Sequence, residues 1–217
     1  MSKKYLVKDN IVLIANGSFP KHRIPLDLIS SAEFVICCDG AANSFQKISK
    51  NIDIIIGDLD SLDNRLLKQN ETEIIHIENQ NDNDLQKGLN WISENTNIQN
   101  LSIIGATGLR DDHSIGNLAS FLYNKYNFNI KIFTDTGCFY VLNQSDTINT
   151  FIGQPISLFC INNNQKITTK GLKYKLKNSS INLYNSTLNI AIEKEITISL
   201  KLDIPVLVYL CYENEKN

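Results

Sequence analysis

Short apolar runs alternate with amphipathic stretches from the start of the chain to about residue 134. The runs are rich in Ile, Val, Leu and Phe, and all but the one at 73–77 are followed by Gly, Asp or Asn, a pattern typical of buried strands in a parallel sheet. This pattern predicts strands at 11–15, 34–38, 52–56, 73–77, 101–104 and 130–134.

Helical periodicity occupies the intervals between these runs. Residues 82–95 form the clearest case, because Leu85, Leu89 and Ile92 recur at helical spacing and the first turn is acidic. A second helix is predicted after Asp112, with one apolar stripe made of Ile115, Leu118, Ala119 and Leu122. Strands that alternate with helices are typical of βαβ units. We therefore predict that residues 1–134 form an α/β domain with a mainly parallel sheet and Rossmann-like layers.

The pattern changes after residue 135, where short apolar runs are separated by polar turns and no helical period continues. Such spacing is typical of antiparallel strands in a sandwich or part-barrel. We predict an all-β, antiparallel, sandwich-like domain over residues 135–217. Its strands are expected at 138–143, 155–161, 166–171, 172–177, 181–185, 187–193, 195–201 and 206–212.

Composition narrows the class of partner. The formal net charge is -2 and the pI is about 5.9, so the chain has no basic footprint for nucleic acid or an anionic membrane. Neither a signal peptide nor a membrane span is evident. The 5 cysteines lack CxxC spacing, which argues against a disulfide framework or a zinc site. A cytoplasmic protein without nucleic-acid or membrane partners is expected.

Carboxylates follow the predicted strands. Asp39 follows the second strand, Asp58 and Asp60 follow the third, and the glycine-rich segment that leads to Asp112 follows the fifth. Asp84 opens the helix over 82–95. Ligands of open α/β sheets bind in the crevice beyond the carboxyl ends of the strands, so we expect these side chains to face one site. Crowded carboxylates repel, and Mg²⁺, which usually binds with substrate phosphates, relieves that repulsion. The sequence thus predicts a metal-dependent enzyme with a phosphorylated substrate.

Each acidic segment also has a structural interpretation. Asp39 either ligates metal or caps the helix that follows it. Alternate residues of an extended loop point the same way, which favours one shared cation for Asp58 and Asp60 over a solvated turn. Asp84 and Lys87 lie one helical turn apart, where they form either a functional pair or a cap with a surface ion pair.

Two segments suit phosphate. Asn16 and Gly17 begin a loop whose free backbone amides would contact a phosphate, although an ordinary turn fits equally well. In the segment from Gly105 to Asn117, glycines shape a loop and Arg110 can fork onto phosphate oxygens. There is no GxxxxGK[ST] loop and no GxGxxG after the first strand. A nucleotide would therefore be held by carboxylates and metal.

Taken in order, the motifs resemble a known family. DGAAN at 39–43, GDLDS at 57–61, NDxxK at 83–87, GATGxRDDHxxGN at 105–117 and GLKYKL at 171–176 are similar to the motifs of thiamine pyrophosphokinases. The resemblance covers nearly the whole chain. It implies an N-terminal catalytic domain, a C-terminal β domain that helps hold thiamine, and a homodimer with sites near the subunit interface. It also implies Mg²⁺-dependent transfer of pyrophosphate from ATP to the thiamine hydroxyl, giving thiamine diphosphate and AMP.

The resemblance also assigns roles to individual residues. The implied metal ligands are Asp39, Asp58, Asp60 and Asp84. The implied catalytic set is Asp60, Asp84, Lys87 and Arg110, with Asp60 or Asp84 as the open choice of general base. The implied ATP-binding residues are Asn16, Gly17, Asp39, Gly40, Arg110, Asp112, His113 and Asn117. The implied thiamine contacts are Tyr174, Thr187 and Asn189.

Some positions depart from the family pattern, and two other functions remain open. Many relatives have threonine where Asn83 stands, and glycine where Leu109 and Ser186 stand. A metal-dependent nucleotide-sugar glycosyltransferase would use Asp58 and Asp60 as its Asp-x-Asp clamp. A non-catalytic sensor of thiamine or nucleotide would keep the same fold, but Lys87 and Arg110 beside the carboxylates favour an enzyme.

Overall fold

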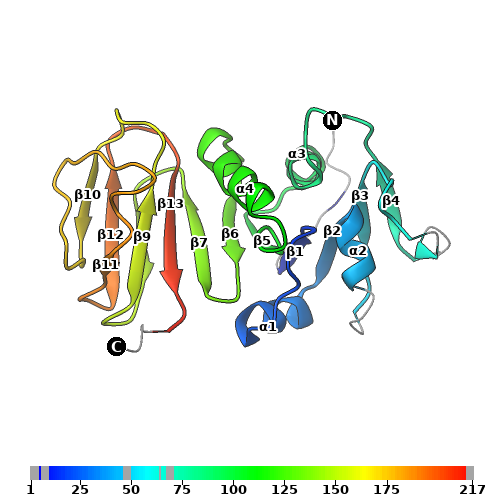
Figure 1. Ribbon diagram of the computed structural model, residues 1–217, viewed down its shortest axis with the longest axis horizontal. Helices are drawn as coiled ribbons and strands as arrows, with labels where there is room; N and C mark the ends of the chain where they lie inside the picture. Colours follow the sequence, from blue (N-terminus) through cyan, green and yellow to red (C-terminus); the bar gives the residue numbers. More distant parts are fainter. Residues whose placement is uncertain (1–4, 6–9, 46–49, 64, 67–70, 214–217) are drawn as a thin grey trace. The chain divides into compact units, whose positions relative to one another are not determined.

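The computed structural model describes residues 5, 10–45, 50–63, 65–66 and 71–213 (Figure 1). The chain forms two compact units. The first unit contains Met1–Leu118 and Tyr126–Asp135, and the second contains Ala119–Lys125 and Thr136–Asn217. None of the helices in the described part of the chain combines the length and apolar character needed to cross a bilayer.

A parallel sheet is the centre of the first unit. Its strands are β1 (Ile11–Ile14), β2 (Phe34–Cys38), β3 (Ile54–Gly57), β4 (Glu73–His76), β5 (Asn100–Ile104) and β6 (Asn129–Phe133), in the order β6-β5-β1-β2-β3-β4. Every adjacent pair among them is parallel. The prediction of six strands in this region is confirmed. The order reverses at β1, whose neighbours are β2 and β5, so the crevice of this sheet lies beyond the ends of β1 and β5.

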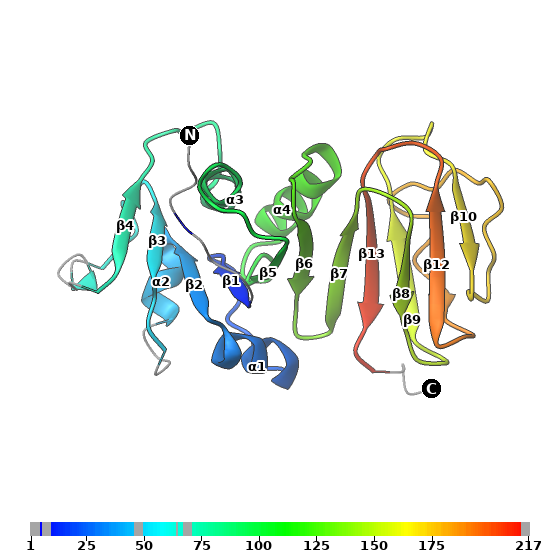
Figure 2. The ribbon, with the colours of Figure 1, turned by 180° about the vertical axis from the view of Figure 1, so that it is seen from behind.

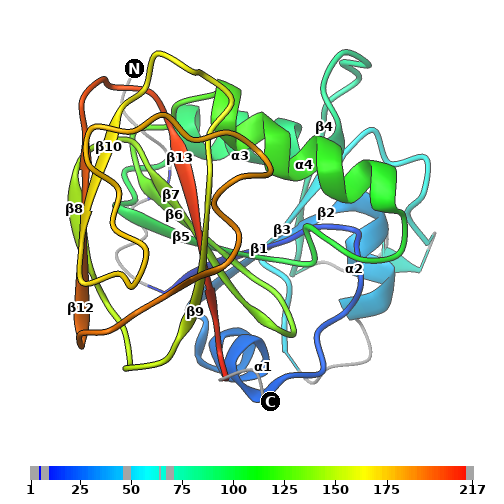
Figure 3. The same ribbon diagram turned by 60° about the vertical axis from the view of Figure 1, so that its left-hand side comes forward.

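Four helices accompany this sheet: α1 (Arg23–Ser31), α2 (Asp39–Phe45), α3 (Asp84–Asn95) and α4 (Asp111–Tyr123). Both α2 and α3 contact β2 and β3. Figures 1 and 2 show these two helices on opposite faces of the sheet. Figure 3 shows α1 and α3 on opposite sides of the strands. Right-handed crossover connections explain this placement. The chain adds strands in one direction from β1 to β4 and in the opposite direction from β4 to β6, so the connecting helices lie on opposite faces of the sheet.

Helix α3 matches its prediction, whereas one residue of α4 does not. The N-cap of α3 is Asn83, which forms a capping box with Gln86, and the helix buries Leu85, Leu89 and Ile92. In α4, Ile115 was expected on the apolar stripe but is 69% exposed. That part of the prediction is wrong, since the first turns of α4 border a polar pocket rather than a core.

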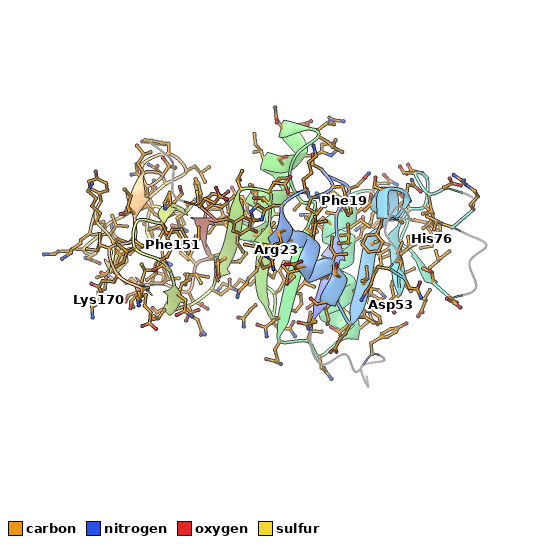
Figure 4. The ribbon with its side chains drawn as sticks, turned by 90° about the horizontal axis from the view of Figure 1, so that it is seen from below. Phe19, Arg23, Asp53, His76, Phe151 and Lys170 are labelled. Carbon is orange, nitrogen blue, oxygen red and sulfur yellow. The ribbon has the colours of Figure 1, made fainter. Side chains whose placement is uncertain are left out.

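The central strands β1, β2, β3 and β5 form because most of their side chains are buried, on both faces of the sheet. Leu13, Ile36, Ile55 and Ile103 are at most 1% exposed. A polar contact fixes the start of β2 beside β3, where Oδ2 of Asp53 accepts a hydrogen bond from the Val35 amide at 2.7 Å (Figure 4). Continuous apolar runs are thus kept at the centre of the sheet, and polar residues are placed at its ends.

The second unit contains two antiparallel sheets. One has the order β11-β9-β13-β7, with β7 at Gly137–Leu142, β9 at Pro155–Phe159, β11 at Asn189–Ile190 and β13 at Val206–Cys211. The other has the order β10-β12-β8, with β8 at Asp146–Asn149, β10 at Ile167–Lys170 and β12 at Glu195–Leu200. A shared core joins the two sheets as expected for a sandwich, and it includes Ile148, Ile156, Leu158, Ile167, Ile196, Ile198 and Val208.

Two predicted strands of this unit, 172–177 and 181–185, are loops instead. Leu172 makes only an isolated bridge, to Ala191. Side chains satisfy the loop amides in place of a neighbouring strand: Oδ1 of Asn182 accepts hydrogen bonds from the amides of Tyr184 and Asn185. Strand β8 was not predicted, because its sequence Asp-Thr-Ile-Asn buries only Ile148.

We expect Gly105→Ala to destabilise the first unit. Gly105 has φ +73°, and a Cβ there would lie 2.4 Å from the carbonyl oxygen of Ala15. A left-handed backbone and a backbone clash together should lower the free energy of unfolding by about 2 kcal/mol or more, measured by urea denaturation. The control is Gly116→Ala in α4, where a Cβ meets nothing within 4 Å. That variant should gain about 0.5–1 kcal/mol, and equal midpoints for the two variants would contradict the interpretation.

Candidate active site

A pocket of about 830 Å³ lies within the first unit, beyond the carboxyl ends of its strands. Four segments line it: the loop after β1, the loop after β3, the start of α3, and the loop after β5 with the start of α4. Its lining includes Asn16, Gly17, Asp58, Asp84, Lys87, Arg110, His113 and Asn117, all of which were candidate residues from the sequence. The wall also contains Cys38, whose pKa is raised by burial and which is a small core residue as expected.

Three carboxylates meet beside this pocket. Asp39, Asp58 and Asp60 each offer an oxygen, and these oxygens lie within 4.8 Å of one another. Asp39 is the first residue of α2, while Asp58 and Asp60 belong to the loop after β3. This loop is not extended as expected, because Leu59 has φ 68° and turns the chain between the two aspartates. The turn nevertheless brings both carboxylates to one point.

Among the described residues, the Asp39 side chain accepts no hydrogen bond from an amide of α2, so it does not cap that helix. Its Oδ2 accepts a hydrogen bond from the Ser61 amide at 3.2 Å, which ties α2 to the loop after β3. Its Oδ1 is buried and has no hydrogen-bond partner among the described residues. Burial raises the pKa of Asp39, the Ser61 amide opposes this, and the neighbouring carboxylates add to the increase. An unpartnered buried oxygen among carboxylates fits a hard divalent cation such as Mg²⁺, which prefers oxygen ligands.

Lys87 is the buried cation of the site, with its side chain only 3% exposed. Its Nζ donates to Oδ2 of Asp58 at 2.9 Å and to Oδ1 of Asp84 at 3.2 Å. Burial lowers the pKa of Lys87, but the hydrogen bonds to the two carboxylates outweigh it, so the pKa is raised. The same contact lowers the pKa of Asp58 to about 2. Lys87 therefore stays protonated, and Asp84 lies beside the lysine rather than in the three-carboxylate group.

The loops after β1 and β5 are joined through their backbones. The Gly17 amide donates to the Gly105 carbonyl at 2.7 Å, and the Ser18 amide donates to the Thr107 carbonyl at 2.9 Å. These two amides are therefore not free for phosphate, which favours the ordinary turn of the two interpretations that the sequence left equally open. The Asn16 side chain packs on Gly40, where a Cβ would lie 2.2 Å from Nδ2 of Asn16. These residues shape the pocket wall.

Arg110 is paired at the rim. Its Nη2 contacts Oδ2 of Asp112 at 2.6 Å and its Nε donates to Oδ1 at 3.1 Å, with both side chains exposed. The guanidinium lowers the pKa of Asp112 to about 2, and the His113 amide also donates to this carboxylate. Asn117, one turn into α4, donates to the Ala106 carbonyl at 2.8 Å. Arg110 can reach an anion in the pocket by exchanging or sharing its carboxylate partner.

The candidate thiamine residues all belong to the second unit. Tyr174 is 57% exposed and Thr187 is also exposed. Nζ of Lys173 lies 5.5 Å from the centroid of the Tyr174 ring, so this ring already accepts a cation. Asn189 is buried, and its side chain bonds both the amide and the carbonyl of Tyr174, at 3.0 and 2.8 Å. Its polar atoms hold the Tyr174 backbone.

Sequence reasoning missed part of the pocket. Gln80, Asn83 and Gln86 line it, and Nε2 of Gln80 lies 3.4 Å from Oδ2 of Asp58. The polar run Gln80 to Asp84 before a helix was the available signal. Leu109 also lines the pocket and has φ 56°, a conformation that favours glycine. This conformation explains why glycine is common there in the family pattern.

A parallel sheet with carboxylates, a buried lysine and a rim arginine beyond its strands defines the class as an α/β protein whose pocket has side chains suited to a cation and to an anion. The family model for "Thiamin pyrophosphokinase, catalytic domain" matches residues 26–134. A second model, "Thiamin pyrophosphokinase, substrate-binding domain", matches residues 137–209. The chain belongs to the thiamin pyrophosphokinase family.

Individual relatives agree with this assignment. "Thiamin pyrophosphokinase 1" of Caenorhabditis elegans is 27% identical over 104 residues, and the match spans 44% of this chain and 42% of that protein. The fold is similar to thiamine pyrophosphokinase from Bacillus subtilis, with a TM-score of 0.76, 20% identity and coverage of 95% of this chain and 100% of that chain. It is also similar to yeast thiamin pyrophosphokinase, with a TM-score of 0.74, 20% identity and coverage of 97% and 92%.

The ion pair between Lys87 and Asp58 should make stability depend on pH. Because the pKa of Asp58 is lowered on folding, its contribution is complete above the unfolded value of about 3.9 and is lost as pH falls toward about 2. We compare the free energies of unfolding of wild type and Asp58→Asn, measured by urea denaturation with a chelator present. The gap between them should be constant at neutral pH and shrink below about pH 4.

The control for this effect is the same comparison in a Lys87→Met background. Removal of the ammonium removes the hydrogen bond that lowers the Asp58 pKa, so the pH-dependent part of the gap should become smaller. An unchanged pH dependence without Lys87 would exclude the lysine as its cause.

Proposed function

We propose that this protein is a thiamin pyrophosphokinase that transfers the pyrophosphate group of ATP to the hydroxyl of thiamine, giving thiamine diphosphate and AMP. The observation that carries the proposal is the group of Asp39, Asp58 and Asp60 beside the buried Lys87. Membership of the family supports it, since both units contain matched segments. A triphosphate and a group of carboxylates repel each other unless a cation lies between them. Asp39, Asp58 and Asp60 are suited to binding such a cation.

In this proposal, Asp39, Asp58 and Asp60 hold Mg²⁺. When bound, Mg²⁺ supplies positive charge to the phosphate oxygens of ATP. We assign Asp84 a role other than the metal ligand that the resemblance implies, because its carboxylate is not part of the group formed by Asp39, Asp58 and Asp60 and accepts a hydrogen bond from Lys87. It fixes the lysine beside the metal ligands, where the ammonium can contact the transferred group.

The reaction breaks one P–O bond and forms another. The thiamine hydroxyl oxygen bonds to the β-phosphorus, the bond from that phosphorus to the oxygen bridging to the α-phosphorus breaks, and AMP leaves with that oxygen. The hydroxyl proton passes to a base or to water, with Asp60 and Asp84 as the candidate acceptors. Such transfers depend mostly on alignment and charge neutralisation. A rigid pocket with cationic side chains can provide both alignment and charge neutralisation.

The two cationic side chains contribute differently. Lys87 is buried and fixed by two carboxylates, so its charge is in position before ATP binds. Arg110 is exposed and paired with Asp112, so it can turn to the phosphates as they arrive. Asp112, His113 and Asn117 then order the nucleotide end of the pocket, together with Asn16 and Gly17 of the adjoining loop and with Gly40, which packs against Asn16.

Thiamine carries a cationic thiazolium ring, which suits an exposed aromatic face. We propose that Tyr174 stacks on a ring of thiamine and that Thr187 contacts it. Asn189 assists by holding the Tyr174 backbone through the two hydrogen bonds of its side chain. A homodimer with sites near the subunit interface, and a cytoplasmic location, stay predictions of the sequence and the family resemblance.

The direct test is incubation of the protein with ATP and thiamine, with and without Mg²⁺, followed by product analysis. We expect AMP and thiamine diphosphate in equal amounts, and neither product without the metal. In a parallel incubation with a nucleotide sugar, release of a nucleoside diphosphate would indicate a glycosyltransferase, and binding of thiamine or ATP without turnover would indicate a sensor. Both outcomes contradict the proposal.

Asp60→Asn should keep the fold and reduce turnover by about 10- to 100-fold, because an amide is a poorer ligand than a carboxylate for a hard cation. The rate of AMP formation is measured across a Mg²⁺ titration, with thermal unfolding as the check on folding. The matched control is Asp27→Asn, which removes the same charge from an exposed pair with Arg23. Wild-type turnover of Asp60→Asn at saturating Mg²⁺ would contradict a role for Asp60 in metal binding.

Tyr174→Ala should raise KM for thiamine by about tenfold and leave KM for ATP unchanged, because one aromatic contact with a cation is lost. Initial rates with each substrate varied in turn give both constants. Tyr123→Ala is the control, since Tyr123 is exposed at the end of α4. Equal changes in both constants would argue against stacking on thiamine.

A further inference from the structure

Three hydrogen bonds run in one direction across the pocket wall of the first unit. The Gln86 amide donates to Oδ1 of Asn83 at 2.9 Å. Nδ2 of Asn83 donates to Oδ1 of Asn117 at 3.1 Å, and Nδ2 of Asn117 donates to the Ala106 carbonyl at 2.8 Å. We call this series the asparagine relay. It connects the N-cap of α3 to the loop after β5.

The direction of the asparagine relay is fixed at both ends. A backbone amide only donates and a backbone carbonyl only accepts, so Gln86 and Ala106 determine which way each carboxamide is oriented. Rotation of either asparagine by half a turn would place donor against donor or acceptor against acceptor. The central bond between Asn83 and Asn117 therefore requires a donor at residue 83 in addition to its capping acceptor.

The relay joins two charged parts of the pocket. Asn83 directly precedes Asp84, and the first turn of α3 also carries Lys87, which contacts Asp58. Ala106 belongs to the loop that leads to Arg110. All four residues of the relay line the pocket. The distance between the lysine side and the arginine side thus depends on a contact between residues that are 34 positions apart in sequence.

We propose that Asn83 is a positioning residue that sets the separation of these two sides and thereby the affinity of the pocket for a nucleoside triphosphate, an inference that rests on the proposed function. Serine or threonine at this position keeps an N-cap acceptor. Its hydroxyl is one bond closer to the backbone than Nδ2 and does not reach Asn117 while it caps the helix. The carboxamide of Asn83 performs both tasks at once.

The test variant is Asn83→Ser, which keeps the cap, adds no charge and removes the central bond. Its KM for ATP should rise about three- to tenfold, the range that one net hydrogen bond corresponds to, while kcat changes less than twofold. Amide hydrogen exchange of residues 105–110 should become faster, because the Ala106 end of the relay loses its support. Asn83→Thr should behave in the same way.

A matched control exists in the same unit. Nδ2 of Asn129 donates to Oδ1 of Asn100 at 3.1 Å, the same kind of bond at the same length, at the amino ends of β5 and β6. Asn100→Ser removes this bond away from the pocket. It should leave both KM for ATP and the exchange of residues 105–110 as in wild type.

A double-mutant cycle with Asn117→Ala separates the relay from independent effects. If Asn83 acts through Asn117, Asn83→Ser should cause no further rise in KM in the Asn117→Ala background. Fold-changes that multiply, or exchange of residues 105–110 that is unchanged in Asn83→Ser, would overturn the proposal. Hydrogen exchange can be measured without turnover. It therefore tests the asparagine relay even if the wild-type protein forms no AMP and the proposed function is wrong. If the wild-type protein forms AMP and Asn83→Ser has the same KM for ATP and the same exchange, the relay is rejected while the proposed function stands.

Discussion

The site depends on one electrostatic contact, the buried ammonium of Lys87 held between Asp58 and Asp84. A buried charge is tolerated only when partners replace its lost hydration, and here two carboxylates do so. The contact joins α3 to the loop after β3, because the lysine belongs to the helix and Asp58 to the loop. The ammonium also partly neutralises the charge of Asp58, the carboxylate next to which Asp39 and Asp60 lie. The carboxylates can therefore remain close together before a cation arrives.

The remaining negative charge explains the rest of the pocket. Asp39 has a buried oxygen that accepts no hydrogen bond from a described residue. Its pKa is raised, because burial disfavours the charged carboxylate. Such an atom is costly in a finished core but suits a place that a cation completes. Arg110 differs, because its pairing with Asp112 is exposed and easily exchanged. One wall is thus fixed in advance and the rim can adapt.

The sequence predicted what short-range physics determines. The central strands are apolar runs buried on both faces, and the outer strands of this unit, β4 and β6, still carry paired or alternating apolar residues, so all six strands of the first unit and helix α3 were found. The convergence of Asp39, Asp58 and Asp60 followed from the crevice rule for open sheets. Two interpretations of the sequence failed for different reasons. At 181–185 the side chain of Asn182 bonds the nearby amides of Tyr184 and Asn185 in place of a strand partner, whereas the amides of Gly17 and Ser18 are taken by the loop after β5, which is distant in sequence. No local pattern reveals that Asn189 is bonded to Tyr174 rather than open to a ligand.

The paired backbones after β1 and β5 also limit how this pocket can change during evolution. The Gly17 and Ser18 amides meet carbonyls two residues apart, at Gly105 and Thr107, so the two loops are in register with each other. Replacement of a side chain leaves that register intact, whereas insertion or deletion of one residue in either loop shifts both partners. Variation in length is therefore expected to accumulate in other surface segments, while these two loops diverge by substitution alone.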